Sequence, residues 1–227
     1  MTKLLICMSG GRTSAYMTKR ILDEYSDQYE IVVCFANTGQ ENDETLDFVK
    51  NCDDYFGFNT VWIEAEVNEG RVGSTHRIVN YKTASRVGKP FEDVVAKYGI
   101  PNVTYVHCTR ELKENPVHSY IKSIGWKKGE YLTAIGIRSD EPKRGNCKWC
   151  YKKSTKKLFQ IMDDDITIFD FPNMLEEKYG HVRDNKIQGV LTDKPRALFR
   201  KYHTTKTLIE LFNETNYKQT NFKFDDE

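Results

Sequence analysis

The chain has 227 residues, of which 39% are hydrophobic and 30% charged, with a formal net charge of +1. This length suits one α/β domain with an appended lobe. The nearly neutral total excludes a general attraction to nucleic acid, so any such binding requires a local basic patch. No apolar run approaches the ~18 residues of a membrane span and no signal peptide opens the chain, so we expect a cytoplasmic protein with no membrane partner.

The first predicted strand is followed by a glycine-rich turn and a helix. Leu4–Met8 is a short apolar run, Ser9–Ser14 reads SGGRTS, and apolar residues then recur at helical spacing. Glycines let a ligand approach the backbone, hydroxyls and helix-start amides donate hydrogen bonds, and Arg12 offers a charged fork. The sequence therefore predicts a phosphate or sulfate site in this turn. A simple helix cap made by Ser9 or Thr13 is the alternative.

A second strand, Glu30–Ala36, ends at the polar turn Asn37–Glu41. A strand, a helix and a strand predict a β-α-β unit and a parallel sheet. Because ligands bind beyond the carboxyl ends of such strands, we expect Asn37–Glu41 and Ser9–Ser14 to face one pocket. Two further strands are predicted over 60–63 and 131–137.

Between Glu64 and Tyr105 the hydrophobic pattern breaks up into a basic, glycine-bearing stretch. A loop of this length inside a compact domain is functional or disordered. Its basic charge suits a lid over an anionic substrate, and a solvated surface loop is the equally weighted alternative. A helix is predicted over 115–122.

Six cysteines are present, and Cys147 and Cys150 form a CxxC about forty residues beyond His107-Cys108. Two-residue spacing lets both thiolates face one metal, which suits zinc or an iron–sulfur cluster. A redox pair and two inert thiols are the alternatives. Cys7 and Cys34 lie in apolar strands and are predicted core residues. Basic residues crowd the same region and indicate a bound anion or a solvated basic face; they are Arg110, Lys113, Arg138, Lys143, Arg144, Lys148, Lys152 and Lys153.

These pieces together resemble the phosphoadenosine phosphosulfate (PAPS) reductase family of the PP-loop adenine nucleotide alpha hydrolase-like superfamily, in a short, phage-type form. The similar stretches follow in the family's order and cover most of residues 4–160; they are CMSGGRTSAYM, VVCFANTGQENDETLDFV, HCTRELKENPVHSYI, AIGIRSDEP and GNCKWCYKKSTKKL.

The resemblance implies a parallel, Rossmann-like α/β sheet over residues 1–160 that binds an adenine nucleotide, with a helical C-terminal lobe over 161–227 that is not independent. The implied phosphate or sulfate ligands are Ser9, Gly10, Gly11, Arg12, Thr13 and Ser14. Asn37, Thr38 and Gly39 would lie near adenine and ribose. Arg110, Lys113 and Arg138 would contact the anion, and we expect Arg12, Lys113 and Arg138 to be catalytic. His107, Cys108, Cys147 and Cys150 would hold a 4Fe-4S-type cluster or zinc.

Three departures from the family bear on function. Thr13 replaces the aspartate of the usual SGGxDS motif, which weakens the inference to standard ATP pyrophosphatase chemistry. No cysteine follows Cys150, so the thiolate of the usual reductase route is missing. The segment between Arg138 and Cys147 is also shorter than in relatives.

We therefore expect an enzyme that acts at the α-phosphate or sulfate region of ATP, PAPS or adenylylsulfate, with Mg²⁺ accompanying the nucleotide. ATP-dependent sulfur transfer is the leading form. PAPS or adenylylsulfate reduction and a non-catalytic nucleotide- or nucleic-acid-binding module are the alternatives. A nucleic acid, a thiol donor and a second copy of the chain are the further partners considered.

Overall fold

The structure, a computed structural model, describes residues 1–70, 72–136, 147–181 and 196–215. The chain forms two compact units. One comprises Met1–Lys97 with His107–Cys147, and the other comprises Tyr98–Val106 with Lys148–Glu227. Residues 148–160 thus group with the C-terminal helices, whereas the sequence indicated a boundary after residue 160.

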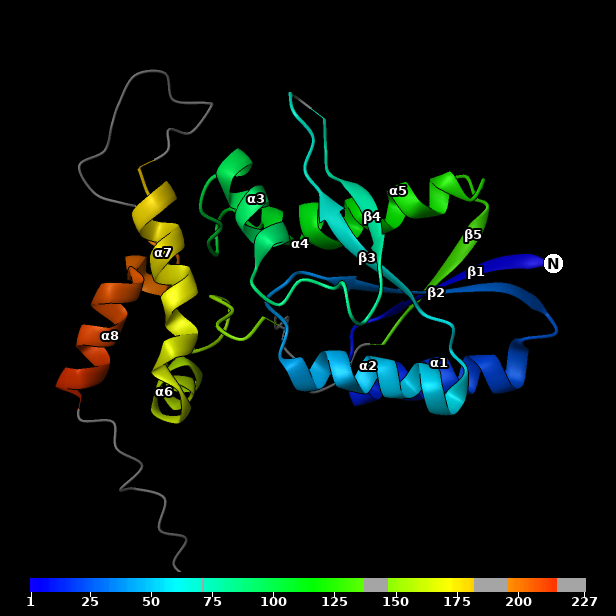
Figure 1. Cartoon of the computed structure of the whole chain (residues 1–227), viewed down its shortest axis with the longest axis horizontal. Helices are drawn as coiled ribbons and strands as arrows, with labels where there is room; N and C mark the ends of the chain where they lie inside the picture. The colour runs from blue at the N-terminus through cyan, green and yellow to red at the C-terminus, as the bar shows by residue number, and fades with distance from the viewer. Residues whose placement is uncertain (71, 137–146, 182–195, 216–227) are drawn as a thin grey trace, which may run out of the picture. The chain divides into compact units, whose positions relative to one another are not determined.

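The first unit is built on a five-stranded sheet in the order β4-β3-β2-β1-β5 (Figure 1). β1 (Thr2–Met8) pairs in parallel with β2 (Tyr29–Asn37) and β5 (Tyr131–Ile135), and β2 pairs in parallel with β3 (Val61–Glu66). β4 (Thr75–Val79) runs antiparallel to β3. Helices flank this mostly parallel sheet, which confirms the predicted α/β fold of Rossmann-like class.

Each face of the sheet is covered by different helices. α1 (Arg12–Tyr25) and α2 (Asp43–Phe56) lie on one face, and α5 (Asn115–Ser123) lies on the other (Figure 1). Successive side chains of a strand point to opposite faces, so Leu4 and Ile6 pack into the core under α1 and α2 while Leu5 joins the core under α5. Burial on both faces explains the continuous apolar run at the start of the chain.

A continuous helical segment leads into α5. It begins as α4 (His107–Thr109), passes through the π-helical turn η1 (Arg110–Glu114) and continues as α5. A π turn inside a helix rotates the following side chains relative to a regular helix, and such turns are frequent at functional sites.

The stretch from Glu64 to Tyr105 contains more regular structure than the sequence indicated. It holds β4 and α3 (Lys89–Tyr98), so the prediction of one long irregular loop was wrong. The role of this stretch as a lid over an anionic substrate stays a prediction. β4 lies at the sheet edge with Arg77 and Ile78 exposed, and an edge strand of this kind has no apolar run to reveal it. The sheet was predicted to be parallel, and β4 is its one antiparallel strand among the described residues.

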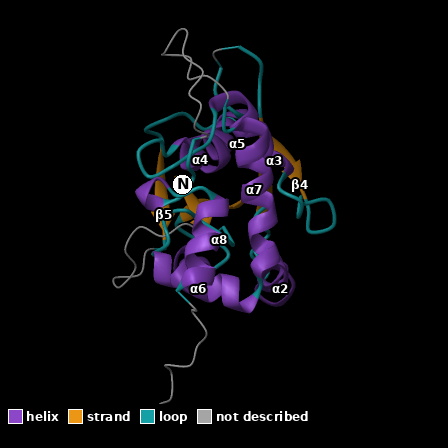
Figure 2. Ribbon diagram, turned by 90° about the vertical axis from the view of Figure 1, so that its left-hand side faces the viewer, coloured by secondary structure: helices purple, strands orange, loops and turns teal. Residues whose placement is uncertain are grey.

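The second unit is helical. Its elements are α6 (Thr155–Asp164), η2 (Ile166–Phe169), α7 (Asp170–Tyr179), η3 (Arg200–Tyr202) and α8 (Thr205–Glu214). Figure 2 shows α8 beside α6 and α7. The buried carboxylate of Glu176 joins these pieces by accepting from Leu198 N at 2.8 Å and Thr205 N at 2.6 Å. Within the described ranges, no helix has both the length and the apolar character needed to cross a bilayer.

Candidate functional site

The turn after β1 leads directly into α1. The first intrahelical hydrogen bond of α1 runs from Ala15 N to Gly11 O at 3.0 Å. The amides of Arg12, Thr13 and Ser14 therefore precede the helical ladder, as the first amides of any α-helix do. Amides in this position, together with the helix dipole, favour a negatively charged ligand.

Ser14 holds the turn in shape from inside. Its hydroxyl donates to Gly11 O at 2.8 Å and accepts from Ser9 N at 3.2 Å and Ser9 Oγ at 3.1 Å. Ser14 is only 1% exposed. Its hydroxyl is thus engaged within the turn, and what Ser14 can offer an anion is its backbone amide.

The rim of the turn is open to solvent. Ser9, Gly11, Arg12 and Thr13 are all exposed, in contrast to the buried Gly10 and Ser14 between them. Hydroxyls, amides and a guanidinium therefore surround one accessible turn. A phosphate or sulfate site at this turn stays a prediction.

Two glycines are needed here for different reasons. Gly10 has a φ of +76°, and a Cβ at this position would overlap Cγ2 of Thr45 on α2. Gly136, directly after β5, lies so close to α1 that its Cβ would stand 2.9 Å from Ser14 Cα. The turn is therefore packed between the start of α2 and the end of β5.

The strand order places this turn at a reversal of the sheet. The chain steps from β1 to β2 to β3 in one direction and then returns to add β5 on the other side of β1. In open α/β sheets, ligands bind outside the carboxyl ends of the strands where the order reverses, because the connections on the two sides lie on opposite faces and leave a crevice. Ser9–Ser14 after β1 and Gly136 after β5 border that position.

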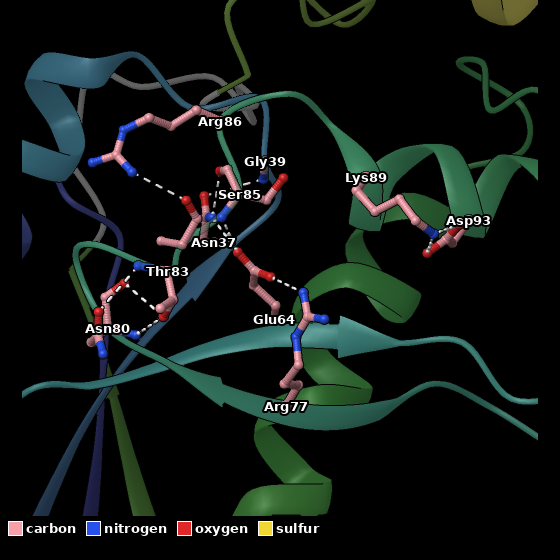
Figure 3. A network of polar contacts seen from close by, with 11 residues as sticks. Asn37, Gly39, Glu64, Arg77, Asn80, Thr83, Ser85, Arg86, Lys89 and Asp93 are labelled. Atoms are coloured by element: carbon pink, nitrogen blue, oxygen red, sulfur yellow. Dashed lines mark hydrogen bonds and ion pairs between the residues drawn. The ribbon is translucent and has the colours of Figure 1, made fainter.

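The turn after β2 differs from the turn after β1. Asn37 is fully buried, and its side-chain amide donates to Glu64 Oε1 at 2.7 Å and to Ser85 O at 2.9 Å while its oxygen accepts from Gly39 N at 3.1 Å. Glu64, also fully buried, further accepts from Ser85 N and Arg77 at 2.6 Å each (Figure 3). Asn37 thus braces the loop through its side chain, and the contact with adenine or ribose expected of Asn37, Thr38 and Gly39 stays a prediction.

A second polar cluster begins at the same turn. Thr38 Oγ1 donates to Glu41 Oε1 at 3.2 Å and lies 3.7 Å from Cys147 Sγ. Lys113 Nζ lies 3.6 Å from Glu41 Oε1. Burial by itself lowers the pKa of Lys113, but the carboxylate of Glu41 and the neighbouring Cys147 and Cys108 raise it above its usual value overall. The structure thus brings the predicted Lys113 beside two predicted cysteines and keeps it a cation.

Arg110 is tied to a different carboxylate. Its Nε donates to Glu111 Oε1 at 2.8 Å, and Glu111 also accepts from Ser74 N and Oγ at 2.9 Å and from Asn115 Nδ2 at 3.1 Å. Burial raises the pKa of Glu111, but the hydrogen bonds from Ser74, Arg110 and Asn115 outweigh it and lower that pKa to about 2. Glu111 therefore fastens the π turn to the loop before β4. The side chain of Arg110 remains 58% exposed and able to reach an anion.

The cysteines of the first strands are core residues, as predicted. Cys34 is 1% exposed, and burial raises the pKa of Cys7 to about 11. Cys52, to which the sequence assigned no role, packs into the core with the apolar side of α2.

The predicted metal ligands are divided between the two units. Cys108 and Cys147 both lie near Lys113 in the first unit, where His107 is also half-buried, whereas Cys150 belongs to the second unit. Among the residues that the structure describes, no three His, Cys, Asp or Glu side chains form a group that could hold a metal ion. The zinc or iron–sulfur site therefore stays a sequence prediction.

Arg138, predicted to be catalytic, lies outside the described residues, as do Lys143 and Arg144 of the basic set. Three buried carboxylates organise this edge of the sheet: Glu41, Glu64 and Glu111. The sequence placed Glu41 in the polar turn expected to face the pocket and indicated no role for Glu64 or Glu111. Glu41 stands in the turn after β2 and Glu64 lies inside an apolar strand. An acid in an apolar strand is the one signal that could have been noticed, because charged side chains are rarely buried without partners.

Comparison with known proteins adds one relative. The chain is 26% identical, over 257 residues, to "Uncharacterized nin region protein ORF290" of Escherichia phage lambda. That alignment covers 94% of this chain and 86% of the relative. No protein-family model and no solved structure matches the chain.

Proposed function

We propose that this protein binds an adenine nucleotide at the Ser9–Ser14 turn and acts at its α-phosphate or sulfate region. The observation that carries the proposal is the position of an exposed, glycine-containing helix start at the point where the strand order reverses. The resemblance of the motifs to the PAPS reductase family supplies the adenine and the reaction class.

In this proposal the backbone and the cations have separate tasks. The amides of Arg12, Thr13 and Ser14 and the hydroxyl of Thr13 hold phosphate oxygens. Arg12 adds a fork that suits a phosphate or sulfate. Lys113, kept charged beside Glu41, stabilises negative charge that develops on the transferred group. Mg²⁺ would arrive as part of the nucleotide substrate and polarise the same oxygens.

Two reactions and one non-catalytic binding role at this site have different products. ATP-dependent sulfur transfer releases AMP and pyrophosphate, reduction of PAPS or adenylylsulfate releases sulfite, and a binding module releases nothing. Calorimetry with ATP, PAPS and adenylylsulfate, followed by product analysis with Mg²⁺ and a thiol donor, distinguishes them. Failure of all three nucleotides to bind would refute the proposal.

Gly11 is the position in the turn where a substitution tests nucleotide binding most directly. Its φ of −100° is accessible to any residue, and an added Cβ would meet only Ser9 Oγ at an ordinary 3.7 Å. Gly11→Ala and Gly11→Val should therefore fold, while increasing bulk over the turn. We expect a graded loss of ATP affinity, at least about 10-fold for valine, with an unchanged melting temperature. Equal affinity of both variants and the parent would place the nucleotide elsewhere.

The metal prediction is tested separately. Anaerobic purification followed by metal analysis of Cys147→Ser, with the core change Cys52→Ser as the control, shows whether Cys147 belongs to a metal site. We expect Cys147→Ser alone to lower the content of iron or zinc. Equal metal content in both variants and in the parent protein would remove Cys147 from the site.

A further inference from the structure

The buried carboxylate of Glu41 has one oxygen that the protein does not use. Glu41 is 3% exposed. Its Oε1 accepts a hydrogen bond from Thr38 Oγ1 and forms the ion pair with Lys113 Nζ. Its Oε2 is buried, and no described residue donates a hydrogen bond to it. A charged acceptor left unpaired away from water is unfavourable, and native proteins rarely keep one without a function or an added ligand.

The orientation of this carboxylate is set by its surroundings. Thr38 holds Oε1 and itself accepts from Gln40 N at 3.3 Å, so that the turn after β2 fixes which oxygen is used. Lys113 Nζ lies 3.6 Å from Oε1 and leaves 34% of its own side chain exposed. The exposed part of this pair is the side chain of Lys113, whereas Oε2 is a buried hydrogen-bond acceptor.

The cluster lies next to the turn that follows β1. β1 and β2 are parallel neighbours, with Met8 opposite Phe35, so their following turns leave the same edge of the sheet. A Cβ added at Gly10 would overlap Cγ2 of Thr45, which lies in the first turn of α2 and follows Glu41 by four residues. A ligand that binds its phosphate at Ser9–Ser14 can therefore extend toward Glu41.

We propose that Glu41 accepts a hydrogen bond from a ribose hydroxyl of the bound nucleotide and so selects ribonucleotides over deoxyribonucleotides. This inference rests on the proposed function, because it takes the nucleotide's phosphate to lie on the turn after β1. In doubly wound folds, an acid near the end of the second strand is placed to do this, since the sugar lies one strand away from the phosphate. A hydroxyl supplies the donor that Oε2 lacks, and a sugar without it leaves the carboxylate unpaired.

The test uses three nucleotides on the unmodified protein. We expect ATP to bind about 10- to 100-fold more tightly than the one of 2′-deoxy-ATP and 3′-deoxy-ATP that lacks the contacted hydroxyl. Loss of a hydrogen bond to a charged group changes a dissociation constant by about this factor. If ATP binds and both deoxy forms bind equally well, the inference is wrong while the proposed function stands. If no adenine nucleotide binds, both are wrong.

Variants then assign the discrimination to Glu41. Glu41→Gln keeps the size of the side chain and removes its charge, and we expect it to reduce the preference for ATP over the deoxy form to less than about 3-fold. Asp43→Asn is the matched control. It removes the same charge from a side chain that is exposed and lies two residues after Glu41 in the chain. An undiminished preference in Glu41→Gln, with its fold verified by circular dichroism, would overturn the assignment.

Discussion

Two polar turns, each at the carboxyl end of a neighbouring parallel strand, have opposite characters in this protein. The turn after β1 is largely exposed and is held by one serine hydroxyl within it. The turn after β2 is buried and bonded to Glu64, to the backbone of Ser85 and, through Glu41, to Lys113. The sequence assigned both to one pocket as ligand-binding loops.

The difference teaches how a brace is distinguished from a binding turn. A polar side chain whose hydrogen bonds are all made inside the protein has little to offer a ligand, as with Asn37. An exposed amide or an unpaired buried oxygen can still form a hydrogen bond with a ligand, as at the start of α1 and at Glu41. On this reading, changes in the turn after β2 should mostly affect stability, and changes in the turn after β1 should mostly affect binding.

The largest effect is expected at Glu64. Glu64→Ala leaves Asn37, Ser85 N and Arg77 without their common acceptor, and we expect it to lower the free energy of unfolding by about 3–5 kcal/mol. Thr13→Ala in the exposed turn should change it by less than about 0.5 kcal/mol. Urea unfolding of both variants measures this. Similar losses in the two variants would remove the distinction between the turns.

Glu111 should make stability depend on pH in the acid range. Its pKa is about 2 in the folded protein and near 4.5 ordinarily, so its contribution is complete above about pH 4.5 and is lost as the pH falls toward 2. At pH 7, Glu111→Gln should lower the free energy of unfolding by about 2–3 kcal/mol, and the gap to the parent should close between pH 5 and 2.5. The exposed Glu114→Gln is the control in urea unfolding across pH. A gap that stays constant with pH would contradict the role of its charge.

The two glycines of the turn after β1 should separate stability from binding. Gly10→Ala forces a side chain onto a positive φ and against Thr45, so we expect a loss of about 1–3 kcal/mol in the free energy of unfolding. Adding Thr45→Ser removes the methyl group in the way and should restore part of that loss. Gly11→Ala should leave thermal stability unchanged. Equal melting temperatures for Gly10→Ala and Gly11→Ala would be inconsistent with this packing.

The smallest effect is expected at Arg12. Arg12→Ala removes one exposed cation from the rim of the turn, and we expect ATP affinity to fall about 3- to 10-fold with no change in melting temperature. The loss should shrink at high salt. Arg20→Ala, on the same helix and paired with Glu24, is the control for a change in total charge. Calorimetry at two salt concentrations measures the loss of ATP affinity and its dependence on salt. An equal loss of affinity in Arg20→Ala would indicate a non-specific charge effect.

Much of the fold could be predicted because its signals are local. The apolar runs of β1 and β2, the helical spacing after Ser14 and the short loops between them all predict a β-α-β unit, which the structure contains. The helix predicted over 115–122 is α5. β4 was missed because an edge strand carries polar residues such as His76 and Arg77 at positions where a buried strand would be apolar.

The candidate site was predictable only in part. The turn after β1 depends on adjacent residues, so its glycines and hydroxyls could be interpreted directly. The role of Asn37 depends on Glu64 and Ser85, which lie 27 and 48 residues away along the chain. The pairing of Glu41 with Lys113 likewise joins two elements that no local pattern connects.

The sequence by itself determined the alternation of strands and helices and the glycines, hydroxyls and helix-start amides that follow the first strand, because hydrophobic period and glycine placement act between near neighbours. Only the tertiary structure decided where the sheet reverses, which polar turn is buried as a brace and which carboxylate keeps an unused oxygen. Those properties depend on the burial of polar groups and on the partners they meet, and both arise when distant segments pack together.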